Sequence, residues 1–140
     1  MRAVRVSVPA TPPTILVVDD DPSIRYALDS VLTGLGYRVL LAARAESAYD
    51  MLESQHADAA LIDVRLPDMS GLALYHALLH RHPGLDGRIA IVSADVDAED
   101  VRGWLEVQHC AAFRKPFRPQ PIIAWLSAVL EGHERKVSGG

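Results

Sequence analysis

The chain has one cysteine, no long apolar run and no excess of basic residues. Cys110 therefore has no partner for an internal disulfide or a redox motif. No apolar segment approaches the roughly 20 residues that span a bilayer, and residues 1–14 lack the apolar core of a signal peptide. The formal charge of −4 leaves no electrostatic footprint for nucleic acid. These absences favour a reduced, cytoplasmic protein that contacts neither membrane nor nucleic acid directly.

The composition is that of an ordinary globular domain. Hydrophobic residues make up 49% of the 140 residues and charged residues 23%. This length is typical of one domain, which can bury most of its apolar surface without disulfides or structural metals. We expect that domain at 14–131, between flexible tails at 1–13 and 132–140.

Short apolar runs alternate along the chain with segments of helical periodicity. The runs are short and rich in β-branched residues, which is typical of strands buried on both faces. The predicted strands are 15–18, 37–42, 59–62, 89–92 and 111–114, and the predicted helices are 22–35, 45–52, 71–82, 98–108 and 121–131. The alternation predicts an α/β fold in which a five-stranded parallel sheet carries helices on both faces.

Polar residues follow four of the five predicted strands. Asp19 and Asp20 follow the first strand, Asp63 the third, Ser93 the fourth and Lys115 the fifth. In open α/β sheets, ligands bind outside the carboxyl ends of the strands, close to the point where the strand order reverses. The sequence therefore predicts that three carboxylates, a hydroxyl and an ammonium converge at one end of the sheet.

This set of groups indicates phosphoryl chemistry. Three close carboxylates repel one another, and oxygen ligands favour a hard cation such as Mg²⁺. A carboxylate can also act as a nucleophile and form an aspartyl-phosphate. A cation on one side and Lys115 on the other would neutralise the transferring oxygens, to which Ser93 could donate a hydrogen bond.

Three segments in this order resemble the receiver domains of two-component response regulators. They are Ile-Leu-Val-Val-Asp-Asp-Asp-Pro at 15–22, Leu-Ile-Asp-Val-Arg-Leu-Pro-Asp-Met-Ser-Gly at 61–71 and Lys-Pro-Phe at 115–117. The resemblance covers about residues 14–131 and includes the spacing from Asp63 to Ser93 and from Ser93 to Lys115. It implies a flavodoxin-like (βα)5 receiver fold.

The resemblance also implies a role for each site residue. Asp63 matches the phosphoacceptor, and Asp19 and Asp20 match the acidic pair that holds Mg²⁺, with Asp20 favoured as the direct ligand. Arg65 lies where the family supplies a backbone carbonyl to the metal, and its side chain is expected at the mouth of the site. Ser93 matches the residue that turns toward the phosphoryl group.

Two further matches concern the residues around the fifth strand. Lys115 matches the invariant lysine of the family, and the bond between Lys115 and Pro116 is usually cis there. The family's switch aromatic usually lies three residues before the lysine, where this chain has Ala112. Phe113 lies one position later, which the period-two rule sends to the opposite strand face. Two roles for Phe113 therefore stay open, a switch residue on an irregular strand or an ordinary core residue.

The resemblance implies partners as well. The phosphoryl donor would be a sensor histidine kinase or a histidine phosphotransfer protein. The output would be a separate effector protein or an effector domain outside this sequence. The changing surface is expected around the fourth helix, fifth strand and fifth helix, which could also form a homodimer. Such a domain catalyses only its own phosphorylation and slow dephosphorylation.

Other classes fit the residues less well. A haloacid-dehalogenase-type phosphatase needs a second Asp two residues after the nucleophile, where this chain has Arg65. A flavin-binding module needs a Ser/Thr/Gly-rich phosphate loop after the first strand, where this chain has three acidic residues. A metal site at His76, His80 and His82 lacks a carboxylate or cysteine to complete it. We expect Trp104 and Trp125 to be core or edge residues of the last two helices.

Overall fold

The computed structural model describes the backbone of residues 11–139 and the side chains of residues 11–131. Five parallel strands form one sheet in the order β2-β1-β3-β4-β5. In chain order the elements are β1 (Thr14–Val18), α1 (Pro22–Gly34), β2 (Arg38–Ala42), α2 (Ala45–Ser54), β3 (Ala59–Ile62), α3 (Gly71–Arg81), the 3-10 turn η2 (Pro83–Leu85), β4 (Ile89–Ser93), α4 (Glu99–Gln108), β5 (Ala111–Arg114) and α5 (Pro119–Gly139). The predicted α/β fold, with its five-stranded parallel sheet and helices on both faces, is confirmed.

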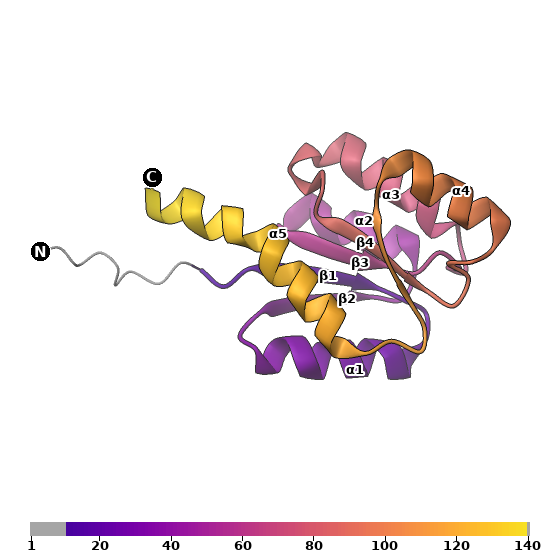
Figure 1. The fold of residues 1–140 in the computed structure, drawn as a ribbon. Coiled ribbons are helices and arrows are strands. Elements are labelled where there is room, and N and C mark those ends of the chain that lie inside the picture. Colours follow the sequence, from indigo (N-terminus) through magenta and orange to yellow (C-terminus); the bar gives the residue numbers. More distant parts are fainter. Residues whose placement is uncertain (1–10, 140) are drawn as a thin grey trace, which may run out of the picture.

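The apolar strands divide their side chains between two cores. In β1, Ile15 and Val17 pack into one cluster, and Leu16 and Val18 into the other. The alternation follows from the two-residue period of a strand, and it explains why these runs are apolar without interruption. Helices α1 and α5 cover the first cluster, and α2, α3 and α4 cover the second (Figure 1).

Most element ends agree with the sequence prediction to within two residues. The clear difference is α5, which was predicted at 121–131 and extends over Pro119–Gly139. Proline is tolerated in the first turn of a helix, because the amide hydrogens there have no partner within the helix. At the other end, Glu, Arg and Lys are good helix formers, so a polar segment without an apolar stripe can still be helical.

The predicted N-terminal tail lies largely outside the described residues, whereas the backbone of residues 132–139, predicted as a flexible tail, continues helix α5. Residues 11–13 have no regular secondary structure, and the rest of the predicted N-terminal tail and Gly140 fall outside the described residues. No helix among the described residues is long and apolar enough to cross a bilayer.

Candidate functional site

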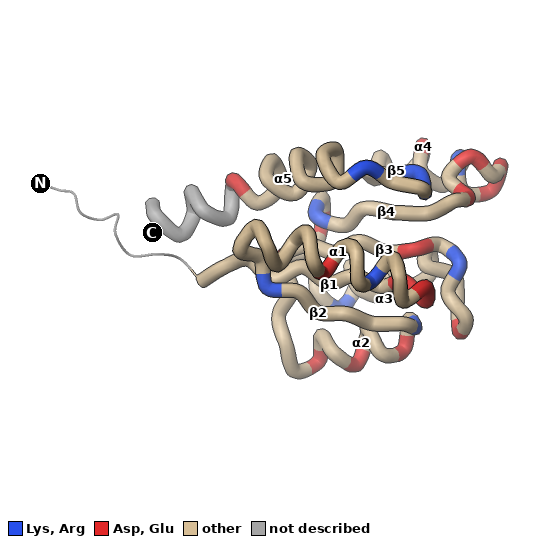
Figure 2. Tube along the Cα trace, turned by 90° about the horizontal axis from the view of Figure 1, so that it is seen from below, with Lys and Arg blue, Asp and Glu red and all other residues tan. Residues whose placement is uncertain are grey.

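The parallel sheet places the predicted site residues together at the end of the sheet where the carboxyl ends of its strands lie. β1 has β2 on one side and β3 on the other, so the order of strands reverses there. The amide nitrogen of Asp63 donates to the carbonyl of Val18 at 2.9 Å, and that of Lys115 donates to the carbonyl of Ser93 at 3.0 Å. These bonds continue the parallel ladders past the strand ends. The loops at this edge carry acidic segments (red in Figure 2).

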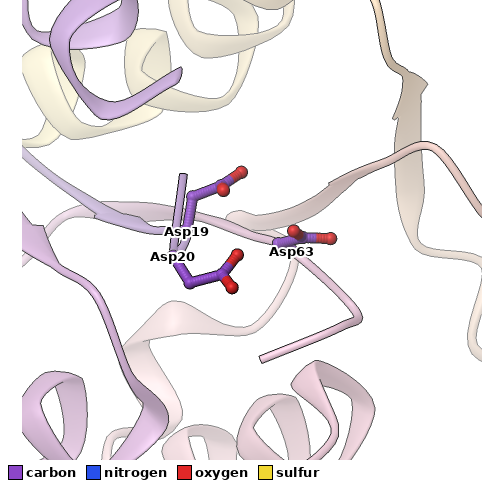
Figure 3. A group of neighbouring side chains, drawn as sticks. All are labelled: Asp19, Asp20 and Asp63. Atoms are coloured by element: carbon purple, nitrogen blue, oxygen red, sulfur yellow. The ribbon is translucent and has the colours of Figure 1, made fainter. Parts of the chain in front are cut away.

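Three carboxylates from two loops converge beside β1 and β3. The side chains of Asp19, Asp20 and Asp63 are neighbours (Figure 3), and a ligand oxygen of each lies within 4.8 Å of the others. Asp19 and Asp63 are buried, and Asp20 is exposed. Because carboxylates at this distance repel one another, the cluster favours a bound cation.

Lys115 lies against two of the three carboxylates. Its Nζ is 2.6 Å from Oδ2 of Asp19 and 3.0 Å from Oδ2 of Asp63. Burial alone would lower the pKa of Lys115, but the hydrogen bonds and charges of the two carboxylates outweigh it, so its pKa is raised. Burial also raises the pKa of Asp19 by more than its hydrogen bond to Lys115 lowers it. The site thus holds three carboxylates and one ammonium, which contacts two of them, so the negative charge of the site is not balanced.

The donor atoms of the cluster fit Mg²⁺. They are oxygens only, and Mg²⁺ in proteins takes one or two carboxylates together with water and phosphate oxygens. Arg65 follows Asp63 by two residues, and its amide nitrogen donates to Oδ1 of Asp63 at 3.3 Å. The backbone of Arg65 thus runs beside the carboxylate of Asp63, and its carbonyl as a metal ligand stays a prediction.

Ser93 ends β4 and is buried, with an exposed fraction of 1%. Its Oγ accepts a hydrogen bond from the amide nitrogen of Asp95 at 3.2 Å. Asp95 in turn forms an ion pair with the side chain of Arg65, which links the loops after β3 and β4. Ser93 is thus held by the loop that leads to α4.

Phe113 lies on the face of the sheet that α1 and α5 cover. It pairs in register with Val92, and its ring meets Trp125 edge-on with centroids 6.2 Å apart. Ala112 pairs with Ile91 and is exposed on the opposite face. β5 keeps the ordinary strand alternation, so the geometry favours the core role for Phe113 over the switch role.

The peptide bond between Lys115 and Pro116 is cis, as the resemblance implies. The two tryptophans are half-buried, and each packs against one of the two clusters. His76 and His80 are exposed, and Nε2 of His76 accepts a hydrogen bond from Nε1 of Trp104 at 3.0 Å.

The sequence alone indicated no role for two residues of the segment after Asp63. A Cβ on Gly71 would lie 2.0 Å from the carbonyl oxygen of Asp63, so α3 can begin this close to Asp63 only with glycine. The carboxylate of Asp68 accepts hydrogen bonds from the amide nitrogens of Ala45 at 2.9 Å and Glu46 at 2.8 Å. Asp68 therefore caps α2, whose own N-cap residue Arg44 provides no side-chain cap. Gly71 and Asp68 both belong to the segment 61–71 that carries the resemblance to receiver domains, and this membership is the sequence feature that points to them.

Comparison with known proteins agrees with this geometry. The model of the response regulator receiver domain matches residues 15–127. The chain is 33% identical over 119 residues to the probable transcriptional regulatory protein TcrX of Mycobacterium tuberculosis, covering 85% of this chain and 50% of TcrX. It is 36% identical over 120 residues to the response regulator MprA of Mycolicibacterium vanbaalenii, covering 85% of this chain and 51% of MprA. The chain thus spans about half the length of these relatives.

A solved structure has the same fold over nearly its whole length. The CheY-like response regulator receiver domain protein from Methanospirillum hungatei superposes with a TM-score of 0.80 at 26% identity, covering 89% of this chain and 98% of that one. A family match over most of the chain and the shared fold lead to one conclusion. The chain belongs to the response regulator receiver domains of two-component systems.

Proposed function

We propose that Asp63 accepts a phosphoryl group from a histidine kinase or a histidine phosphotransfer protein, with Mg²⁺ bound, and that this shifts a conformational equilibrium. The observation that carries the proposal is the surroundings of Asp63. Its carboxylate is buried just after the carboxyl end of β3. It lies within 4.8 Å of the carboxylates of Asp19 and Asp20, and 3.0 Å from the Lys115 ammonium. A carboxylate in this setting has the partners that an acceptor needs on both sides.

The proposed step is an in-line displacement at phosphorus. A carboxylate oxygen of Asp63 forms the new O–P bond while the P–N bond of the donor phosphohistidine breaks. The electron pair of the broken bond remains on the imidazole nitrogen, so no oxidant or reductant takes part. Lys115 is placed to balance the charge on the transferring oxygens.

Mg²⁺, held by Asp19, Asp20, Asp63 and the carbonyl of Arg65, would supply further neutralisation of charge. The bound acyl phosphate is hydrolysed slowly when water replaces the donor. A water oxygen then forms a bond to phosphorus while the bond from phosphorus to the Asp63 oxygen breaks. The electron pair of that bond restores the carboxylate of Asp63, and the phosphoryl group and the elements of water leave as inorganic phosphate. Arg65 is a guanidinium paired with Asp95, so it cannot be the second acid/base carboxylate of a haloacid-dehalogenase-type phosphatase.

The proposed conformational change depends on contacts that the phosphoryl group makes in one loop arrangement and not in the other. The added phosphoryl oxygens can meet Ser93 and Lys115 together in only one arrangement of the loops after β4 and β5, which biases the equilibrium toward that arrangement. A near-complete switch would require roughly 5.5 kcal/mol of differential affinity. We propose the surface of α4, β5 and α5 as the output face, for an effector or a second copy of this chain. TcrX and MprA extend beyond the matched region, so the effector could belong to the same polypeptide. A cytoplasmic location stays a prediction.

Acetyl phosphate tests the acceptor assignment without a kinase. In the presence of Mg²⁺, the parent chain should gain the mass of one phosphoryl group, and Asp63→Asn should gain none. Asp50→Asn is a matched control, because Asp50 is an exposed residue of α2 away from the site. The control should be labelled like the parent. Labelling of Asp63→Asn at the parent level would show that another residue is the acceptor.

A further inference from the structure

Arg65 and Asp95 join two loops of the site. Nε of Arg65 lies 2.7 Å from Oδ2 of Asp95, and its NH2 group lies 3.9 Å from Oδ1 of Asp100 in the first turn of α4. Arg65 belongs to the loop after β3, which carries Asp63, and Asp95 belongs to the loop between β4 and α4. One side chain thus ties the acceptor loop to the segment that leads into α4.

Each member of this pair also donates a backbone hydrogen bond to a site residue. The amide nitrogen of Arg65 donates to Oδ1 of Asp63 at 3.3 Å, and that of Asp95 donates to Oγ of Ser93 at 3.2 Å. The four residues therefore form a connected chain from the acceptor carboxylate to the Ser93 hydroxyl. In this arrangement Ser93 is engaged with the loop.

The carboxylate of Asp63 lies beside Arg65, whose amide nitrogen donates to its Oδ1 at 3.3 Å. A phosphoryl group on Asp63 would carry about −1.5 to −2 charges and strong acceptor oxygens. These oxygens would compete with the single charge of Asp95 for the guanidinium, which prefers bidentate contact with phosphate.

We propose that the ion pair between Arg65 and Asp95 is a latch on the unphosphorylated state. Phosphorylation of Asp63 draws the Arg65 guanidinium away from Asp95, and the loop from Ser93 to α4 is then free to rearrange. Arg65 acts here as a positioning residue that transmits the state of Asp63 to the output side. The inference rests on the proposed function of Asp63, and it adds the link from the acceptor to the β4–α4 loop.

A second ion pair of the same loop provides a control. Asp97 pairs with Arg114 of β5, and both side chains are more than half exposed. Arg114 is the register partner of Ser93 in the sheet, but no side-chain hydrogen bond or ion pair among the described residues joins Asp97 or Arg114 to Asp63 or Ser93. Asp97→Ala removes one negative charge and one ion pair from the loop, as Asp95→Ala does, but leaves the proposed latch intact.

The test uses beryllofluoride, an analogue of the phosphoryl group, with Mg²⁺ and the full chain. Replacement of Trp125 by Phe leaves Trp104 of α4 as the fluorescent reporter. Asp95→Ala should bind beryllofluoride about 1.5 to 5 times more tightly than the parent, because an exposed ion pair of typical strength no longer has to break. Asp97→Ala should bind like the parent.

The decisive measurement repeats Asp95→Ala in an Arg65→Ala background, where the latch is already absent. We expect the gain in affinity to disappear there. If the gain persists, Asp95 acts only by repelling the anion, and the latch is overturned; an unchanged affinity in both backgrounds also overturns it. Failure of the parent to take a phosphoryl group from acetyl phosphate would instead refute the proposed function, and the latch with it.

Discussion

The ammonium of Lys115 lies 3.0 Å from a carboxylate oxygen of Asp63, although 52 positions separate the two residues in the chain. The same ammonium is 2.6 Å from Asp19. Lys115 therefore neutralises the oxygens that the proposed metal would also bind. In the proposed mechanism, the lysine would oppose metal binding before transfer and balance the phosphoryl charge afterwards.

Lys115→Ala should separate these two effects. Removal of the ammonium leaves the carboxylates of Asp19 and Asp63 without a counter-charge, so the affinity for Mg²⁺ should rise about threefold to tenfold, or roughly 0.6–1.4 kcal/mol. Labelling by acetyl phosphate should become slower at saturating Mg²⁺. Titration calorimetry and intact mass measure the two quantities.

The matched control for Lys115→Ala is Arg114→Ala, which removes the adjacent exposed cation. Arg114→Ala should change neither the affinity for Mg²⁺ nor the rate of labelling by acetyl phosphate by a comparable factor. Weaker Mg²⁺ binding by Lys115→Ala would contradict the competition between the lysine and the metal.

Asp19→Asn should stabilise the metal-free protein at neutral pH. Burial raises the pKa of Asp19 above its ordinary value of 3.8, so the folded state binds this proton more tightly than the unfolded state. The charged carboxylate thus lowers stability at neutral pH, and this cost disappears as the pH falls through the folded pKa toward 3.8. The variant should have a higher Tm than the parent at pH 7, with a gain that shrinks toward acid pH.

Thermal unfolding in EDTA measures this gain, and in a domain of this size about 1 kcal/mol corresponds to roughly 4 °C. Asp50→Asn, an exposed change, should leave Tm and its pH dependence close to those of the parent. A lower Tm for Asp19→Asn at pH 7 would mean that the contact with Lys115 outweighs the cost of burial.

Gly71→Ala should damage both stability and transfer. The added Cβ would meet the backbone of Asp63 at 2.0 Å, and neither group is a flexible side chain that can move away. Overpacking of this kind costs typically about 1–3 kcal/mol, and the shift should also displace the acceptor carboxylate. We expect a lower midpoint in urea unfolding and slower labelling by acetyl phosphate.

Gly103→Ala provides the contrast, because no atom lies within 4 Å of a Cβ on this residue of α4. It should stabilise the protein slightly, by roughly 0.5–1 kcal/mol, through helix propensity. If Gly71→Ala were as stable as Gly103→Ala, there would be room for a Cβ between α3 and the backbone of Asp63, which would contradict the predicted clash.

Cys110 should be unreactive in the folded protein. Its Sγ donates to the carbonyl of Ile89 at 3.3 Å, and burial raises its pKa to about 12 from 9.0. Since the thiolate is the nucleophile, alkylation by iodoacetamide at pH 8 should be about a thousandfold slower than in guanidinium chloride. Mass spectrometry over time measures both rates, and comparable rates in the two conditions would contradict the burial of this thiol.

The α/β fold class followed from the sequence because it depends on local patterns and a general rule. The apolar runs identify the strands, the intervening periodicity identifies the helices, and parallel strands have their carboxyl ends at one edge. Asp19, Asp63 and Lys115 could therefore be placed together before any contact was known. The predicted range of α5 was too short, since helix propensity changes little along its polar end.

Only the tertiary structure determined which contacts the residues around the site make. Sequence spacing left Phe113 with two roles, and its register with Val92 and contact with Trp125 favour the core. The partner of Arg65 lies 30 positions away in another loop, so no local pattern could identify Asp95. The strand pattern and the rule of parallel sheets determined the site, because both depend on residue type and spacing. The contact of Gly71 with Asp63 and the link from Arg65 to Asp95 depend on where separate loops meet in space, which only the folded chain determines.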